Sequence, residues 1–584
     1  MASRNKKVAA GPADSEGRPQ GRPELIVVLP AAAVMVQGGR VMPSDGPSRD
    51  LLASIADAPP DTLDTAQACI RPLFRSNPER LAVAIPPETD RVVSPLGQYF
   101  IVDGVVGGAE PLLEQLRAVD VVAGVYLKPT AQPPAPRAPR AALNEMAPRV
   151  EEPPTVTPDF KGRQGYLGPA PGGVDAQWAW TQQGGRGEGV NVIDVEGPWW
   201  LSHEDLLPRQ IGVSAGTPPD DIGWPNHGTA ATGVVGSAEN GLGFTGIAPK
   251  ASLSPTSIFG TGMSSPSAIK LATDALNAGD ILLIELHCLG PLVGRMGQRG
   301  CIAVEWWPDD YDAIVYAVSR SIIAAEAGGN GSQDLDNPAY GTPQTSFPPS
   351  WRNPFRQGLR DWGAIVVGAS VPPPGTHGSS TWGPDRSRLA FSNFGSMIDA
   401  QGWGREVTTC GHGDLQDGSG SEDYWYTGQG SGTSSASPLI TGSLTCVQGT
   451  LRAAAATPLI PQAGQQTAVS QRIGNRPDIR ALVALAREPK DKDGQEEQKK
   501  KKEGGGESFV KLEKDEFKEM LEQGRPQPRP EDATSGLEAP LTTLEGAVAE
   551  LRHFISSEDW PDLTVVAHSE SAVAASSNIS SGGE

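Results

Sequence analysis

The chain has 584 residues, enough for several domains and a large buried core. Its formal net charge is −21 and its pI is near 4.9. This acidity argues against electrostatic capture of nucleic acid or of an anionic membrane by the chain as a whole.

Residues 1–23 are polar with a little positive charge and lack the apolar core of a secretory signal. Because no later stretch is a long uninterrupted apolar run, we expect no membrane span and a protein that is cytoplasmic or exported by an unconventional route. The five cysteines are widely separated and never spaced as C-x-x-C, which argues against a disulfide framework or a zinc knuckle.

Residues 24–128 predict a small α+β domain. Short β-rich runs occur at 24–29, 81–85, 98–102 and 124–128, and Leu112, Leu113 and Leu116 have helical spacing. Residues 129–159 contain so many prolines that neither a helix nor a central strand can persist there. We therefore place an extended linker and a domain boundary at 129–159.

Residues 160–487 predict a larger domain in which strands and helices alternate. Nearly continuous apolar strands are expected at 189–194, 251–255, 280–286, 321–327 and 364–369, with helices between them. This pattern favours a mostly parallel sheet with helices on both faces, where functional sites form at the carboxyl ends of strands. Residues 488–584 are rich in mixed charge, and we expect them to be largely disordered.

Three segments of the larger domain place a reactive side chain beside glycine at the edge of a predicted element. Asp194 ends a strand in GVNVIDVEG, His227 opens a helix in NHGTAATG, and Ser434 starts a helix in GTSSASP. A serine hydroxyl needs a base to accept its proton, and the imidazole needs a carboxylate to orient it. These three residues supply those parts.

Attack on a carbonyl also creates an oxyanion, which must be stabilised by fixed donors. Asn330 follows the predicted strand 321–327 in the sequence EAGGNGS and offers a side-chain amide. The backbone N–H of Ser434, at the start of its helix, is the second candidate donor.

These segments, in the order Asp, His, Ser with an asparagine before the serine, resemble the subtilisin-like serine proteases, the subtilase family (peptidase S8). The resemblance runs from about residue 173 to the helix after Ser434 and includes GLGFTGIAPKASL and LAFSNFGSMIDAQGWG. It implies a three-layer catalytic domain and a serine endopeptidase acting on proteins or peptides through an acyl-enzyme.

The resemblance also implies roles for other parts of the chain. Cys288, Leu289 and Gly290, with Gly328 and Gly329, would line the cleft and pair with the substrate backbone. Residues 24–128 would be a propeptide that assists folding, inhibits the catalytic domain as an intramolecular partner, and is then removed. Family members often bind calcium, but no D-x-[DN]-x-[DN]-G loop is present, so we assign no metal ligand and no cofactor.

The sequence departs from the family at two places. The aspartate segment reads Asp194-Val195-Glu196-Gly197, where the family has Asp, then Thr or Ser, then Gly. Cys288 stands where the family has a serine at the substrate-binding edge.

Two other functions use the same sequence features. One is a catalytically silent subtilase-like module that binds peptides, and the other is an esterase with the same triad. Taken singly, Asp194 reads as a turn-capping carboxylate, His227 as a hydrogen-bonded helix-start residue and Ser434 as a helix N-cap. Their joint occurrence favours the peptidase.

Overall fold

The structure is a computed structural model of the chain. It describes residues 23–37, 40–43, 51, 53, 55, 62–63, 68–74, 96–105, 109–134, 156–219, 225–292, 298–344, 346–356, 363–377, 382–417, 421–453, 473–474 and 476–485. The strand expected at 81–85, most of the linker at 129–159, and the terminal regions 1–22 and 488–584 lie outside the described residues.

A six-stranded parallel sheet forms the centre of the larger domain, in the order β14-β13-β12-β9-β7-β8. Its side chains are almost all buried, because helices cover both faces. The strands are β7 (Asn191–Glu196), β8 (Ser252–Ser257), β9 (Ile281–Ile284), β12 (Ile323–Ala327), β13 (Ile365–Ser370) and β14 (Ala400–Trp403).

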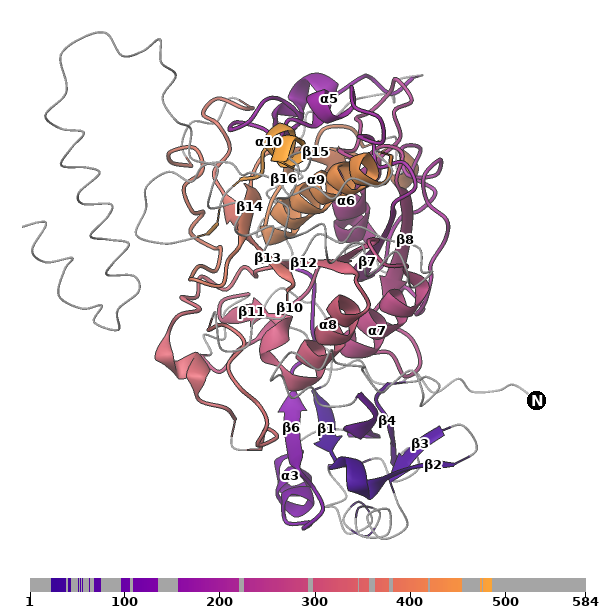
Figure 1. Ribbon diagram of the computed structural model, residues 1–584, viewed down its shortest axis with the longest axis vertical. Coiled ribbons are helices and arrows are strands. Elements are labelled where there is room, and N and C mark those ends of the chain that lie inside the picture. Colours follow the sequence, from indigo (N-terminus) through magenta and orange to yellow (C-terminus); the bar gives the residue numbers. More distant parts are fainter. Residues whose placement is uncertain are drawn as a thin grey trace, which may run out of the picture. The chain divides into compact units, whose positions relative to one another are not determined.

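Helices cover both faces of this sheet (Figure 1). Helices α6 (Pro225–Gly236) and α9 (Thr433–Ala453) pack together on one face, and α7 (Ser265–Ala275) and α8 (Pro308–Ser319) pack together on the other. The short helices α5 (Ala176–Ala179) and α10 (Ile479–Leu485) contact α9. The expected three-layer α/β architecture is confirmed.

Smaller antiparallel elements border the sheet. Strand β10 (His287–Leu289) pairs with β11 (Cys301–Ala303), and β15 (Val407–Cys410) pairs with β16 (Tyr426–Gly430). All five cysteines are free thiols. Among the described helices, none is both long and apolar enough to cross a membrane.

The N-terminal part contains the expected small sheet, which is antiparallel with the order β4-β5-β1-β6. Its strands are β1 (Glu24–Val28), β4 (Cys69–Pro72), β5 (Tyr99–Asp103) and β6 (Gly124–Lys128), joined by a hairpin of β2 (Val34–Gln37) and β3 (Arg40–Pro43) and by helix α3 (Glu110–Arg117). Leu112, Leu113 and Leu116 of α3 are buried, which confirms the helical spacing read from the sequence.

One buried ion cluster attaches this sheet to the larger domain. Lys128, at the end of β6, has its ammonium nitrogen 2.7 Å from Asp309 Oδ2 and 2.5 Å from Asp310 Oδ2, at the start of α8. All three side chains are 0% exposed. Burial lowers the pKa of Lys128, but the two carboxylates raise it more, so the net shift is upward and the lysine stays charged.

Aromatic side chains extend this contact. Tyr126 of β6 packs on Trp307 and Phe347, with ring centroids 6.0 and 5.0 Å apart, and Trp306 packs on Trp307, Phe347 and Trp351. No role for Trp306 and Trp307 could be predicted from the sequence. The structure places them in the aromatic cluster that supports β6.

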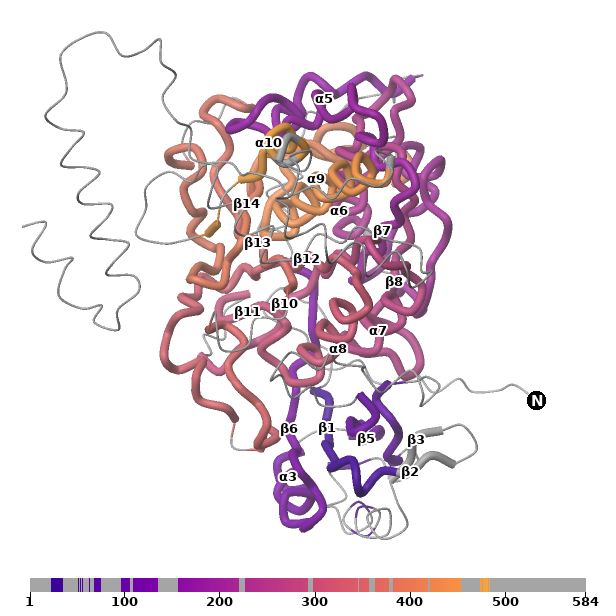
Figure 2. The backbone as a smooth tube through the Cα atoms, viewed as in Figure 1, coloured from indigo at the N-terminus to yellow at the C-terminus, as the bar shows by residue number. Residues whose placement is uncertain are grey.

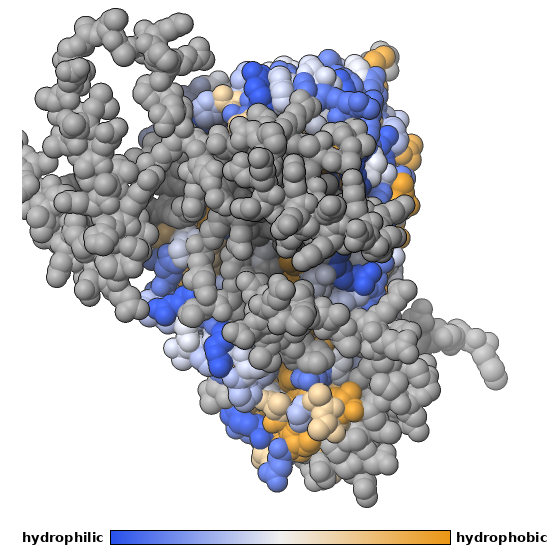
Figure 3. Space-filling model, viewed as in Figure 1, coloured by the Kyte–Doolittle hydropathy of each residue, from blue (hydrophilic) through white to orange (hydrophobic). Residues whose placement is uncertain are grey.

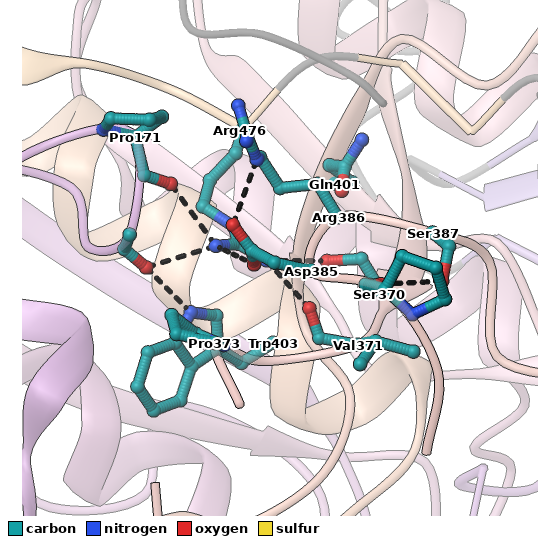
Figure 4. A network of polar contacts seen from close by, with 12 residues as sticks. Pro171, Ser370, Val371, Pro373, Asp385, Arg386, Ser387, Gln401, Trp403 and Arg476 are labelled. Atoms are coloured by element: carbon teal, nitrogen blue, oxygen red, sulfur yellow. Dashed lines mark hydrogen bonds and ion pairs between the residues drawn. The ribbon is translucent and has the colours of Figure 1, made fainter. Parts of the chain in front are cut away.

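Buried Arg476 fixes the C-terminal end of the described chain (Figure 4). Its guanidinium donates to the carbonyls of Pro171, Gly172 and Val371, to Ser370 Oγ and to Asp385 Oδ1, over distances of 2.9 to 3.1 Å. The larger domain therefore extends at least to the residues that follow this arginine.

In the part of the surface coloured in Figure 3, hydrophilic residues predominate around α5.

We expect Lys128→Ala to lower the free energy of unfolding by about 3–5 kcal/mol, because it leaves two carboxylates buried without their cation. The matched control is Lys250→Ala, since Lys250 and its partner Glu188 are 53% and 41% exposed and such pairs contribute about 0–1 kcal/mol. Urea unfolding of the full chain measures both values. Equal losses in the two variants would contradict the role given to Lys128.

Candidate active site

The end of β12 and the start of α9 meet at the side chain of Asn330. Its Oδ1 accepts hydrogen bonds from the Thr433 backbone N–H at 2.9 Å and from Thr433 Oγ1 at 3.0 Å. Because both donors bind the oxygen, the orientation of the amide is determined and Nδ2 is the donating end. Nδ2 donates to the carbonyl oxygen of Pro134 at 3.2 Å and to Gln298 Oε1 at 2.9 Å.

Ser434, the second residue of α9, contacts the same carbonyl. Its Oγ donates to the Pro134 oxygen at 2.8 Å. A peptide carbonyl from the N-terminal part of the chain therefore lies between the serine hydroxyl and the asparagine amide. Ser434 and Asn330 are both buried, at 5% and 9% exposure.

Gly432 makes this close approach feasible. It has φ +119°, and a Cβ at this position would lie 2.9 Å from Ser434 Oγ, 3.1 Å from the Pro134 oxygen and 3.2 Å from Asn330 Nδ2. Both the backbone conformation and the space therefore require glycine.

His227, the third residue of α6, lines one pocket together with Ser434. Small residues form much of the rest of this pocket, among them Ala230, Ala231 and Ser435. The Nδ1 atom of His227 lies 2.5 Å from Oε2 of Glu196, the last residue of β7. The carboxylate that orients the imidazole in the structure is therefore that of Glu196.

From the sequence, this contact was expected to come from Asp194. Asp194 Oδ2 instead accepts hydrogen bonds from Trp199 Nε1 at 2.8 Å and from Thr232 Oγ1 at 2.9 Å. Residues 194 and 196 point to the same side of β7, because strand side chains alternate. Glu196 lies nearer the carboxyl end of the strand and is longer by one methylene, so it reaches the imidazole.

The two carboxyl groups are electrostatically coupled. Burial first, and then the charge of Glu196, raise the pKa of Asp194 well above its usual range. Burial also raises the pKa of Glu196 well above its usual range, and hydrogen bonds from Asp194 and from the Gly197 N–H offset only part of this rise. Two carboxyl groups this close and this deeply buried do not both ionise at low cost, so the pair resists carrying two negative charges.

A third carboxyl group, that of Glu285, lies behind this pair. It is fully buried, and Ser437 Oγ donates to its Oε1 at 2.5 Å. Burial, followed by the charges of Glu196 and Asp194, raises its pKa well above the usual range. Glu285 therefore resists ionisation beside the other two carboxyl groups.

Two further histidines, His287 and His412, flank the site. Burial, and then His227, lower the pKa of His287 to about 3, and its Nδ1 accepts a hydrogen bond from the Asn330 N–H at 3.4 Å. His412 lines the pocket of His227, and burial lowers its pKa to about 4 although Asp414 raises it. Both are neutral around pH 7.

The chain that follows β6 runs past β10 toward the end of β12 as an extended segment (Figure 2). Gln132 of this segment forms an antiparallel bridge with His287, with N–H to O distances of 3.0 and 2.9 Å. The strand edge that binds backbone is therefore at His287, adjacent to the predicted Cys288.

The other predicted cleft residues have mostly internal partners. Cys288 contacts the segment through its thiol, which donates to the Pro129 carbonyl at 3.0 Å. Leu289 pairs with Cys301, and the Gly290 N–H donates to Gly300. The backbone N–H groups of Gly328 and Gly329 donate to the Val367 carbonyl and to Thr433 Oγ1.

Within the described residues, no three His, Cys, Asp or Glu side chains are grouped so as to hold a metal ion. The site consists of a serine, an imidazole held by a carboxylate and an amide donor, set at the carboxyl edge of a parallel sheet. These are the parts of an acyl-transfer site of the serine-hydrolase type.

Comparison with known families agrees with this class. Residues 210–490 match the model of the Subtilase family, so the chain contains a domain of that family. The matched range includes His227, Asn330 and Ser434 but begins after β7, the strand that carries both carboxylates.

Solved structures of proteases are similar to this chain. The epidermin leader peptide processing serine protease of Staphylococcus aureus is 12% identical, with a TM-score of 0.45 over 80% of this chain and 99% of that one. A serine-to-alanine mutant of it gives a TM-score of 0.46 at 12% identity, over 80% of this chain and 100% of that one. Fervidolysin from Fervidobacterium pennivorans, a keratinolytic enzyme related to subtilisin, is 14% identical with a TM-score of 0.42, over 73% of this chain and 55% of that one. No curated protein sequence matches the chain.

We expect Gly432→Ala to abolish labelling of Ser434 by a fluorophosphonate probe, because the added methyl group would crowd the serine hydroxyl and the amide donor. Gly189→Ala is the matched control: Gly189 also has a positive φ, of +76°, but a Cβ there would meet nothing within 4 Å. Each change strains the backbone by about 1 kcal/mol. Labelling that falls equally in both variants would contradict the specific role of Gly432.

Proposed function

We propose that the chain is a serine endopeptidase in which Ser434 is the nucleophile, His227 the general base and acid, and Glu196 the carboxylate that orients His227. The observation that carries the proposal is the Pro134 carbonyl, whose oxygen accepts hydrogen bonds from both Ser434 Oγ and Asn330 Nδ2. A peptide carbonyl is the group that such an enzyme attacks.

In the proposed reaction, Ser434 Oγ attacks the carbonyl carbon while His227 accepts the hydroxyl proton. The oxygen becomes negative, and the Asn330 amide and the N–H groups at the start of α9 stabilise it. His227 then gives the proton to the leaving amine. Water, activated by the same imidazole, hydrolyses the acyl-enzyme.

Glu196 supports both proton transfers. A carboxylate at Nδ1 fixes the tautomer that leaves Nε2 able to accept a proton, and it stabilises the imidazolium that forms. Glu196 contacts the imidazole directly, and the hydrogen bond from Asp194 lowers the pKa of Glu196 and so supports its ionised form.

We also propose that residues 24–128 act as an intramolecular inhibitor. The ion cluster at Lys128 and the aromatic cluster under Tyr126 attach this part to the catalytic domain. The segment that follows then occupies the strand edge at His287 and the donors at Asn330 and Ser434. Substrates would have to displace it.

The class of reaction is tested by fluorophosphonate labelling followed by turnover of casein and of short-chain esters, with Ser434→Ala as the unlabelled control. We expect labelling at Ser434 and cleavage of casein. Folded protein without labelling would favour the peptide-binding module. Labelling with ester turnover but no peptide cleavage would favour the esterase.

The assignment of the orienting carboxylate predicts different effects for two conservative variants. Glu196→Gln is expected to lower kcat by about 10³–10⁴-fold, because the amide does not stabilise the imidazolium and can impose the wrong tautomer. Asp194→Asn is the matched control, and we expect it to lower kcat by less than about tenfold. Steady-state kinetics on one peptide substrate measures kcat for both variants. A larger loss of kcat in Asp194→Asn than in Glu196→Gln would show that Asp194 is the carboxylate that orients His227.

We expect kcat/KM to fall in acid, because the imidazole of His227 must be neutral to accept a proton and free histidine titrates at about pH 6.5. A profile of kcat/KM between pH 5 and 9 measures this. A rate that stays flat across that range would contradict an imidazole base.

A further inference from the structure

We propose that the bond that follows the Pro134 carbonyl, Pro134–Ala135, is the first bond that the enzyme cleaves, and that the site accepts proline as the residue whose carbonyl is attacked. The inference rests on the proposed peptidase function. It goes beyond that function by naming the bond and the class of substrate: extended chains with proline before the cleaved bond.

The first support is the position of the Pro134 carbonyl. Its oxygen lies 2.8 Å from Ser434 Oγ and 3.2 Å from Asn330 Nδ2. The Asn330 amide is locked toward it by the two bonds from Thr433. Among the carbonyls of the described linker residues, that of Pro134 is therefore the one presented to the nucleophile.

The second support is the register of the segment. Gln132 forms both backbone hydrogen bonds to His287, two residues before Pro134. Four residues earlier, Lys128 is held in its buried ion cluster. A shift by one residue would break the pairing at His287 or pull the lysine out of its cluster, so these two anchors select Pro134.

The third support is that two consecutive prolines suit this cleft. Proline has no backbone N–H, so it cannot donate a hydrogen bond at a position where the cleft offers a backbone acceptor. In this segment the backbone donor that pairs with the strand edge belongs to Gln132, which precedes Pro133 and Pro134. Prolines also restrict the segment to extended conformations before it binds, which lowers the entropic cost of binding.

The proposed cleavage balances as an ordinary peptide hydrolysis. Ser434 Oγ forms an ester with the Pro134 carbonyl carbon, the bond to the Ala135 nitrogen breaks, and His227 carries the serine proton to that nitrogen. Water then hydrolyses the ester, which regenerates Ser434 and leaves a carboxylate on Pro134. The new chain begins at Ala135.

The full chain and its Ser434→Ala variant, made in the same host, provide the test. Intact mass and N-terminal sequencing are expected to show a new N-terminus at Ala135 in the wild type and an uncut chain in the variant. Cleavage of the variant at the same bond would overturn the proposal, because a host protease would then account for the cut. A wild-type N-terminus at another residue would also overturn it.

The pairing at Gln132 is tested with two variants of the full chain. Gln132→Pro removes the N–H that donates to His287, and we expect it to slow the appearance of the Ala135 terminus by about tenfold. Gln132→Ala keeps the backbone donor and is expected to change the rate less than about threefold. Equal rates in the two variants would contradict the register.

The preference is tested with the peptide TAQPPAPR, residues 130–137, and with the peptide that carries leucine in place of Pro134. We expect cleavage of the first peptide before its second alanine, with kcat/KM within about tenfold of the second. If Ser434 reacts with the fluorophosphonate and the leucine peptide alone is cleaved, the inference fails while the peptidase proposal stands. If Ser434 does not react, the peptidase proposal fails and the inference with it.

Discussion

The two hydrogen bonds from Thr433 to Asn330 Oδ1 determine what this site can bind. They turn the amide so that Nδ2 donates toward the carbonyl beside Ser434. Without these bonds the Asn330 amide could turn so that Oδ1 faced the Pro134 carbonyl, and the two oxygens would repel each other. The bonds exist because the parallel sheet brings the end of β12 against the start of α9, and Gly432 leaves room between them.

The second requirement is a single negative charge beside His227. Asp194, Glu196 and Glu285 are all buried near one another, and they cannot all be ionised at low cost. Trp199 and Thr232 hold Asp194, Ser437 holds Glu285, and Glu196 is left in contact with the imidazole. Of the three carboxyl groups, Glu196 is therefore the one that touches the base.

Much of this arrangement could be predicted from sequence. The apolar runs of the larger domain predicted its parallel sheet, and the spacing of the leucines predicted α3. Both predictions were possible because the spacing of apolar residues shows which side chains will be buried. His227, Asn330 and Ser434 were singled out because each follows or opens a regular element beside glycine. The structure brings His227 and Ser434 to one pocket and Asn330 and Ser434 to one carbonyl.

The sequence did not distinguish Asp194 from Glu196, since both lie on the same side of β7 and only their reach and their partners separate them. It also placed the substrate edge at Cys288 to Gly290, although the pairing residue is His287. A strand edge shows its register only when a partner is bound. The contacts of Trp307 with Tyr126 and of Lys128 with Asp309 join residues more than a hundred positions apart, which local patterns do not contain.

A crystal structure of the full chain inactivated by a peptidyl phosphonate would examine these relations together, because the phosphonyl oxygen occupies the position of the oxyanion. The account predicts a covalent bond to Ser434, an oxygen within hydrogen-bonding distance of Asn330 Nδ2, and His227 Nδ1 bonded to Glu196. An adduct in which Asn330 turns away from that oxygen, or in which Asp194 holds the imidazole, would contradict it.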